Sequence, residues 1–286
     1  KTGEGFNVRP YYRAANLEGI DFLQAEAGRF PYVRGTHNDN TWLVHQTVAV
    51  ECPKEANRTA LKLLESGVDS IGFCIKSEEV TAQQLDELLS GIVLPAVELT
   101  FCGSKVSHIA EMVIAYAERH GVAKDDLRAN FCIDPIIADL SVKGDFCCNN
   151  GEKCFARIAE LIKATDDYKH VRIVNVSGAT FSNAGSTIVE ELAFSLSAAH
   201  EYIVRLTDLG LSIDQVARKI RFSLAVTSNY FLEMAKFRAA RLLWANIVKG
   251  YNPEKECSCK MFAHATTSAW NQTVYDPYVN MLRGTT

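Results

Sequence analysis

VRIVNVSGATFSNAG, at residues 171–185, reads as a buried strand, a tight turn and the start of a long helix. The strand is rich in β-branched residues, which favour extended structure. The turn is the Ser-Gly-Ala-Thr sequence at residues 177–180. In a barrel of repeated strand–helix units, such a turn lies at the end where catalysis takes place. Ala179 and Thr180 nevertheless offer almost no chemistry at this position.

Outward from this segment, strand-like runs alternate with helical patterns, which is the signature of parallel βαβ units. Strands are expected at residues 42–50, 70–75, 96–101, 129–133, 171–176, 220–225 and 261–266, and helices at 54–66, 81–90, 104–120, 152–164, 184–209 and 228–249. About seven strand–helix units predict an α/β fold, a TIM (β/α)8-type barrel that is incomplete at its C-terminus, because such a barrel has eight units. We expect an N-terminal arm at 1–41, with a short helix near 20–25, and a barrel domain at 42–286 without its eighth unit.

Local signals support the helices of this pattern. Pro53 suits the first turn of a helix, and Gly67 and Gly121 stand where a left-handed helix cap favours glycine. The two longest helices carry apolar residues at helical spacing. These are Leu192, Leu196, Ala199, Ile203 and Leu206 in the first helix, and Phe231, Met234, Ala235, Leu242 and Ile247 in the second.

The composition excludes several classes of function. The chain has 286 residues, is 48% hydrophobic and 22% charged, and carries a net charge of −4 with acids and bases interspersed. This gives no electrostatic footprint for nucleic acid or for an anionic membrane. No apolar run approaches the roughly 18 residues of a membrane span. Nine scattered cysteines, an odd number mostly in apolar runs, indicate reduced thiols and a cytoplasmic protein.

Four further strings carry a family resemblance. FPYVRG at 30–35, FLEMAKFRAARLLW at 231–244 and TVYDPYVNMLR at 273–283, with AHATTSAW at 263–270, resemble the methylmalonyl-CoA mutase family. The likeness spans nearly the whole chain and is greatest to the small, non-catalytic beta subunit of the heterodimeric bacterial enzymes. In that family an eighth barrel unit and a cobalamin-binding domain follow the region resembled here.

The resemblance implies an isomerase of propionate metabolism. The family interconverts (R)-methylmalonyl-CoA and succinyl-CoA by radicals that adenosylcobalamin supplies, while the acyl-CoA threads its pantetheine arm along the barrel axis. A small subunit would pair with a catalytic large subunit that binds the adenosylcobalamin, so we expect no cofactor in this chain. The isolated chain could form a homodimer. If no ligand enters, side chains are expected to fill the barrel axis, because voids cost stability.

At the positions that carry the family's chemistry, the sequence departs from its catalytic members. Ala179 and Thr180 stand where these members have a Tyr-His pair after the fifth strand. After the fourth strand, Asp134 and Asp139 would repel a substrate carboxylate, and the nearest cation is Lys143 instead of a bidentate Arg. Residues 35–42, before the first strand, contain no tyrosine, and Thr266 replaces a Gln after the seventh strand. The resemblance therefore implies a chain without catalytic residues.

Four positions are candidates for vestigial CoA contacts. Arg221 and Ser223 match an Arg-x-Ser that contacts CoA in catalytic members, and His264 and Thr266 lie on the seventh strand. Each also has a structural interpretation, Arg221 as an ion-pair partner and His264 as a core histidine. The charged residues at 233–241 can form i,i+3 and i,i+4 pairs, and each alone is typical of a solvated helix face.

Two alternatives stay open. The chain could be a competent acyl-CoA mutase with altered acyl specificity, although catalytic relatives keep the residue that faces the thioester. It could also be a barrel enzyme that uses His37, His45 and Asp39 on a metal, although these residues equally make a polar turn. Cysteines at 147–148 and at 257 and 259 lack the paired spacing of a zinc site, so no metal is predicted.

Overall fold

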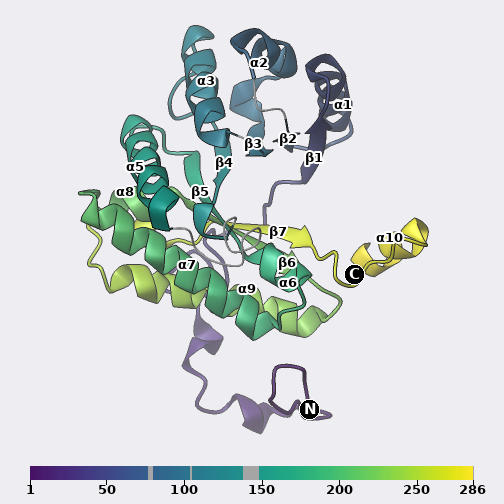
Figure 1. Cartoon of the computed structure of the whole chain (residues 1–286). Helices are drawn as coiled ribbons and strands as arrows, with labels where there is room; N and C mark the ends of the chain where they lie inside the picture. The colour runs from purple at the N-terminus through teal and green to yellow at the C-terminus, as the bar shows by residue number, and fades with distance from the viewer. Residues whose placement is uncertain (77–79, 104, 138–147, 286) are drawn as a thin grey trace. The chain divides into compact units, whose positions relative to one another are not determined.

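The computed structural model describes residues 1–76, 80–103, 105–137 and 148–285. The described residues contain seven parallel strands in one sheet of order β1-β2-β3-β4-β5-β6-β7 (Figure 1). Strands that follow one another in sequence are neighbours, as in a (β/α)8 barrel. This confirms the predicted fold class, an α/β barrel with one strand fewer than eight in the described part.

The chain divides into two compact units. One unit comprises residues 41–175 and 205–221, and the other comprises 1–40, 176–204 and 222–286. The elements that begin in the first unit are β1 (His45–Val50), α1 (Pro53–Glu65), β2 (Ser70–Ile75), α2 (Ala82–Leu89), η3 (Leu94–Ala96), β3 (Glu98–Gly103), α3 (Val106–Arg119), β4 (Ala129–Ile133), α5 (Cys148–Ala164), β5 (Val171–Ser177), α8 (Ile213–Ala217) and β6 (Ile220–Val226). Those that begin in the second are η1 (Ala14–Leu17), η2 (Asp21–Gln24), α6 (Gly178–Asn183), α7 (Ile188–Asp208), α9 (Tyr230–Lys249), η4 (Glu256–Cys259), β7 (Ala263–Thr267) and α10 (Pro277–Thr285).

In the first unit, the strands bury an aromatic row against the helices. Phe73, Phe101 and Phe131 occupy corresponding positions of β2, β3 and β4, and their ring centroids lie 5.9 Å and 5.6 Å apart in succession. All three side chains are buried. Side chains alternate along a strand, so the residues between them face the opposite side of the sheet. That inner face holds the polar residues described below.

Most predicted elements are confirmed, and the differences have local causes. The strands at 70–75 and 129–133 have the predicted bounds, and Gly67 and Gly121 adopt positive φ angles of 94° and 67°. The long helix begins at Ile188 instead of 184, because residues 178–183 form the separate short helix α6. α10 begins at Pro277, the first helical position, where the missing N–H of proline costs nothing.

The orientation predicted for α9 is wrong. Phe231 and Met234, expected in the core, are 80% and 47% exposed, whereas Glu233 and Lys236 are buried. The largest buried apolar side chain of the helix is that of Trp244, whose ring packs edge-to-face on Phe222 with centroids 4.9 Å apart. Glu233 and Lys236 can face inward because they pair with each other and Lys236 also pairs with Glu191.

The N-terminal residues lie on the surface of their unit. Among the described residues 1–30 none is buried, and the helix expected near 20–25 is the 3-10 turn η2. The carboxylate of Glu4 accepts hydrogen bonds from the backbone N–H groups of Ile188 and Val189, both at 3.0 Å. A carboxylate at this place satisfies two unpaired donors of α7 and complements its dipole. In the described part of the chain, no helix combines the length and apolarity needed to cross a membrane.

Candidate functional site

The turn after β5 is the first turn of a buried helix. β5 ends at Ser177, and α6 begins at Gly178. Ala179 is buried, and Thr180 is half-buried with its Oγ1 atom 2.9 Å from the Ser177 hydroxyl. Ala179 has no polar side-chain group, and a hydroxyl paired with another hydroxyl is a weak acid and a weak base. Ala179 and Thr180 therefore lie directly after β5, and their side chains can supply only a hydroxyl.

Glycine is required at position 178 because the backbone there approaches α7 closely. A Cβ atom at this position would overlap the Ser195 hydroxyl and lie 2.8 Å from Leu224 Cδ2. Ser195 is itself held, because its hydroxyl donates to the Glu191 carbonyl at 2.6 Å. The close approach brings α6 against the polar network that contains Glu191.

We expect Gly178→Ala to lower the free energy of unfolding by about 1–3 kcal/mol, the usual cost of overpacking a well-packed site. Urea denaturation measures this, with Gly3→Ala as the control because a Cβ there has no atom within 4 Å. Adding Ser195→Ala should recover part of the loss by removing the overlapped hydroxyl. Equal stability of Gly178→Ala and Gly3→Ala would contradict the predicted overlap.

The segment after β5 is also bound to the segment after β7. The Oδ1 atom of Asn183, the last residue of α6, accepts hydrogen bonds from Ala269 N at 2.9 Å and Ser268 Oγ at 3.3 Å. Gly185 lies against the ring of Trp270, which a Cβ atom would approach to 3.0 Å. These contacts fix α6 over the carboxyl end of the strands in its unit.

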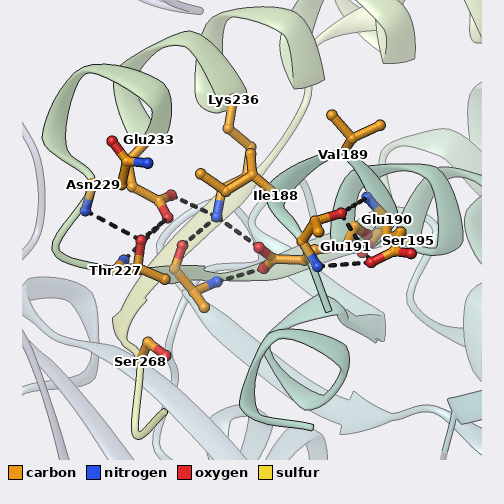
Figure 2. Close-up of polar contacts among 12 residues, drawn as sticks. Ile188, Val189, Glu190, Glu191, Ser195, Thr227, Asn229, Glu233, Lys236 and Ser268 are labelled. Atoms are coloured by element: carbon orange, nitrogen blue, oxygen red, sulfur yellow. Dashed lines mark hydrogen bonds and ion pairs between the residues drawn. The ribbon is translucent and has the colours of Figure 1, made fainter. Parts of the chain in front are cut away.

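A buried charged network occupies the carboxyl end of β6 (Figure 2). Lys236 Nζ lies 2.7 Å from Glu191 Oε2 and 2.6 Å from Glu233 Oε2. All three side chains are at most 4% exposed. Burial raises the pKa of Glu191, although the Lys236 ammonium beside it acts in the opposite direction. Two carboxylates and one ammonium thus share an environment in which an unpaired charge would be costly.

The network also binds backbone groups at the carboxyl end of β6. Ala225 N donates to Glu191 Oε1 at 2.7 Å, and Ala225 O accepts from Lys236 Nζ at 2.6 Å. Glu233 Oε1 accepts from both the backbone N–H of Thr227, at 3.1 Å, and its hydroxyl, at 2.6 Å. Buried backbone groups must be paired, so side chains from α7 and α9 complete the hydrogen bonding of this strand end.

The inner face of the first unit carries a row of register partners across five strands, and four of them have polar side chains. Thr47, Gly72, Thr100, Asn130 and Arg172 are successive register partners on β1 to β5. Asn130 Nδ2 donates to Thr100 Oγ1 at 3.4 Å, and both side chains are buried. Such a layer is how a small barrel fills its interior. Burial lowers the pKa of Arg172 to about 10, with Glu98 opposing and Arg221 assisting the change.

A second polar group lies at the amino ends of the first three strands. The Ser70 hydroxyl donates to Glu98 Oε1 at 3.1 Å, so its oxygen accepts from His45 Nδ1 at 2.8 Å. His45 Nε2 then accepts from the Thr47 hydroxyl at 3.2 Å. A neutral ring satisfies both contacts. Burial, followed by the positive charge of Arg221, lowers the pKa of His45 to about 4, although Glu98 opposes the change.

The His45 group predicts a pH dependence of stability. Between pH 6.5 and about 4 the unfolded chain binds a proton on His45 that the folded chain does not bind. The free energy of unfolding therefore falls as pH falls through this window. Denaturation of wild type and His45→Gln at several pH values tests this: the difference between them should shrink toward pH 4. The exposed His108→Gln should parallel wild type, and a constant difference for His45→Gln would contradict the prediction.

Three thiols line the inner face near the carboxyl ends of the strands. Cys74 and Cys102 are register partners, and all of Cys74, Cys102 and Cys132 are free and half-buried. Burial raises the pKa of Cys132 to about 11, which is typical of an unreactive structural thiol. Cys74 also lines a cavity of about 280 Å³, together with Ala49, Val50, Glu51 and Lys76.

The structure places each candidate CoA contact. Ser223 and His264 are register partners on β6 and β7, Thr266 is the partner of Ala225, and all three candidates are half-buried. Arg221 is buried and donates from Nη1 to Thr100 Oγ1 at 3.3 Å. CoA contact by these four residues stays a prediction. Asp139 and Lys143 lie outside the described residues, and Asp134 Oδ1 accepts from Ile137 N at 3.2 Å.

The described residues do not support a site for a metal ion or for a corrinoid. No group of three or more His, Cys, Asp or Glu side chains there is arranged to hold a metal ion, including the alternative set of His37, Asp39 and His45. At the turn after β5, Ala179 and Thr180 carry neither an imidazole nor an aromatic ring, and the ring of Phe181, the next residue of α6, packs against Phe194 with centroids 5.2 Å apart. The residues described at this turn therefore do not fit adenosylcobalamin.

Fold and site together define a class of protein: an α/β-barrel chain of strand–helix units, with polar networks at both ends of its strands. The sequence model of the methylmalonyl-CoA mutase family matches residues 1–79 and 72–286, and the chain belongs to that family. The family uses adenosylcobalamin.

Three relatives cover 99% of the chain. The chain is 37% identical to the methylmalonyl-CoA mutase small subunit of Porphyromonas gingivalis, covering 46% of that protein. It is 31% identical to the small subunit of Streptomyces virginiae and 29% identical to the large subunit from the same organism, covering 45% and 42% of them. The chain thus spans less than half the length of these curated relatives.

Proposed function

We propose that this chain belongs to the small subunit of a heterodimeric methylmalonyl-CoA mutase. It supports a catalytic large subunit in the adenosylcobalamin-dependent interconversion of (R)-methylmalonyl-CoA and succinyl-CoA, and carries no catalytic residue itself. The large subunit binds the cofactor, and the enzyme works in cytoplasmic propionate metabolism. The observation that carries the proposal is the turn after β5, where Ala179 is buried in α6 and Thr180 pairs with Ser177.

Two further observations support this role. The carboxyl end of β6, which in a barrel enzyme faces the substrate, is occupied by the network of Glu191, Glu233 and Lys236. The relatives include a small and a large subunit from Streptomyces virginiae, which supports a large-subunit partner for this chain.

The test uses the full-length protein with and without the large subunit from the same source. We expect no conversion of methylmalonyl-CoA to succinyl-CoA by the protein alone, with adenosylcobalamin present. With the large subunit we expect co-purification and turnover. Turnover without the large subunit would instead favour an autonomous mutase, and failure to co-purify would contradict the proposed partner.

A substitution in the turn after β5 tests whether the Thr180 hydroxyl takes part in the chemistry. Thr180→Ala removes the one side-chain hydroxyl that α6 offers next to Ser177. If the chain is not catalytic, this change leaves the turnover of the reconstituted pair within about twofold. A loss of 100-fold, the order of magnitude for removing a catalytic hydrogen-bond donor, would show that Thr180 takes part in the chemistry.

A further inference from the structure

The Arg221 side chain crosses the inner face of the first unit. It begins on β6 and donates to Thr100 on β3, with the donor and acceptor atoms 3.3 Å apart. In the sheet order, β4 and β5 lie between these two strands. The contact therefore joins strands that are not neighbours, and Cys132 of β4, one of the strands between them, interacts electrostatically with the guanidinium.

The path of Arg221 is closely packed. Arg221 is 3% exposed, Thr100 5% and Asn130 1%, and Thr100 also accepts from Asn130. Arg172, the register partner of Asn130, adds a second buried guanidinium to the same layer. An elongated ligand could pass along this face only if the Arg221–Thr100 hydrogen bond broke and a buried cation moved.

We infer that Arg221 is a strut that closes the interior of this unit to an elongated ligand such as the pantetheine arm of an acyl-CoA. The inference deepens the proposed function, on which it rests for the choice of ligand. It also assigns Arg221 the opposite role to a vestigial CoA contact. A strut excludes the ligand, so its removal increases binding, whereas the removal of a contact decreases binding.

Titration calorimetry of the full-length protein with propionyl-CoA and with free pantetheine distinguishes a strut from a CoA contact. Removing Arg221 increases binding in the first case and decreases it in the second. We expect weak or no binding by wild type and at least tenfold tighter binding by Arg221→Ala. Thr100→Val, which removes the acceptor of the strut, should change binding in the same direction by a smaller factor. Arg218→Ala is the matched control, because this neighbouring arginine bonds outside the layer to Asp166 and should bind like wild type.

Two results would overturn the inference: tight binding by wild type that Arg221→Ala weakens, or equal binding by wild type and Arg221→Ala. If Arg221→Ala does not fold, Arg221→Met keeps much of the stem without the donor, and the same comparison applies. The outcome is separable from that of the proposed function. Turnover by the protein alone contradicts the proposed function, whereas the sign of the binding change decides the role of Arg221.

Discussion

Replacing Lys236 by Met is expected to lower the free energy of unfolding by about 3–5 kcal/mol, because it leaves two carboxylates buried without their cation. Glu191 and Glu233 are 1% and 4% exposed as side chains, and both lie within 2.7 Å of the ammonium. The substitution also removes the donor to the Ala225 carbonyl. Denaturation in urea measures the loss, and Lys249→Met, at the exposed end of the same helix, should stay close to wild type.

Substitutions of the two acids distinguish a charge network from packing alone. Glu233→Gln leaves Glu191 and Lys236 as a neutral pair and keeps an oxygen for Thr227, so we expect a loss of about 1 kcal/mol, that of one hydrogen bond. Adding Glu233→Gln to Lys236→Met should cost less than the sum of the two single changes, because one buried charge has gone. Additive losses would show that the charges act independently.

The Lys236 network also shows what sequence reasoning could and could not predict. Strands buried on both faces read as continuous apolar runs, so those at 70–75 and 129–133 were predicted with their observed bounds. The face of α9 was not, because its inward charges depend on Glu191, which lies 45 residues earlier in the chain than Lys236. A pattern within one helix contains no information about such a partner.

The location of the candidate site could be predicted from the sequence, but the residues of the interior layer beside it could not be identified in the same way. Ala179 and Thr180 lie at the end of β5, as expected from the β-branched run before them. Arg172, Thr100 and Asn130 were missed as members of an interior layer. A signal existed, since each is a polar residue inside an apolar strand and alternates with buried apolar neighbours. The contact that Arg221 of β6 makes with Thr100 of β3 joins residues 121 positions apart in the sequence, so no local pattern could predict it.

Arg241 joins two of the sequence strings that carry the family resemblance. From α9, its Nε donates to the Tyr32 carbonyl and its Nη2 to the Val33 carbonyl, both at 3.0 Å. Burial lowers the pKa of Arg241, and the nearby Arg238 acts in the same direction. Tyr32 is buried, and its hydroxyl donates to the Glu256 carbonyl at 3.3 Å. The residues before Tyr32 are exposed or half-buried, so this anchor holds the N-terminal segment to its unit.

Arg241→Ala is therefore expected to cost about 3 kcal/mol, from two hydrogen bonds made by a charged donor at about 1.5 kcal/mol each. Arg241→Lys should restore less than half of this, because an ammonium lacks the planar fork that reaches two carbonyls at once. Hydrogen exchange and limited proteolysis should show residues 29–35 opening before the rest of the unit unfolds. Arg238→Ala, an exposed arginine on the same helix, is the control. If Arg241→Ala left exchange at 29–35 unchanged, the anchor would have to lie in the Tyr32 side chain, and Tyr32→Phe would then give the larger effect.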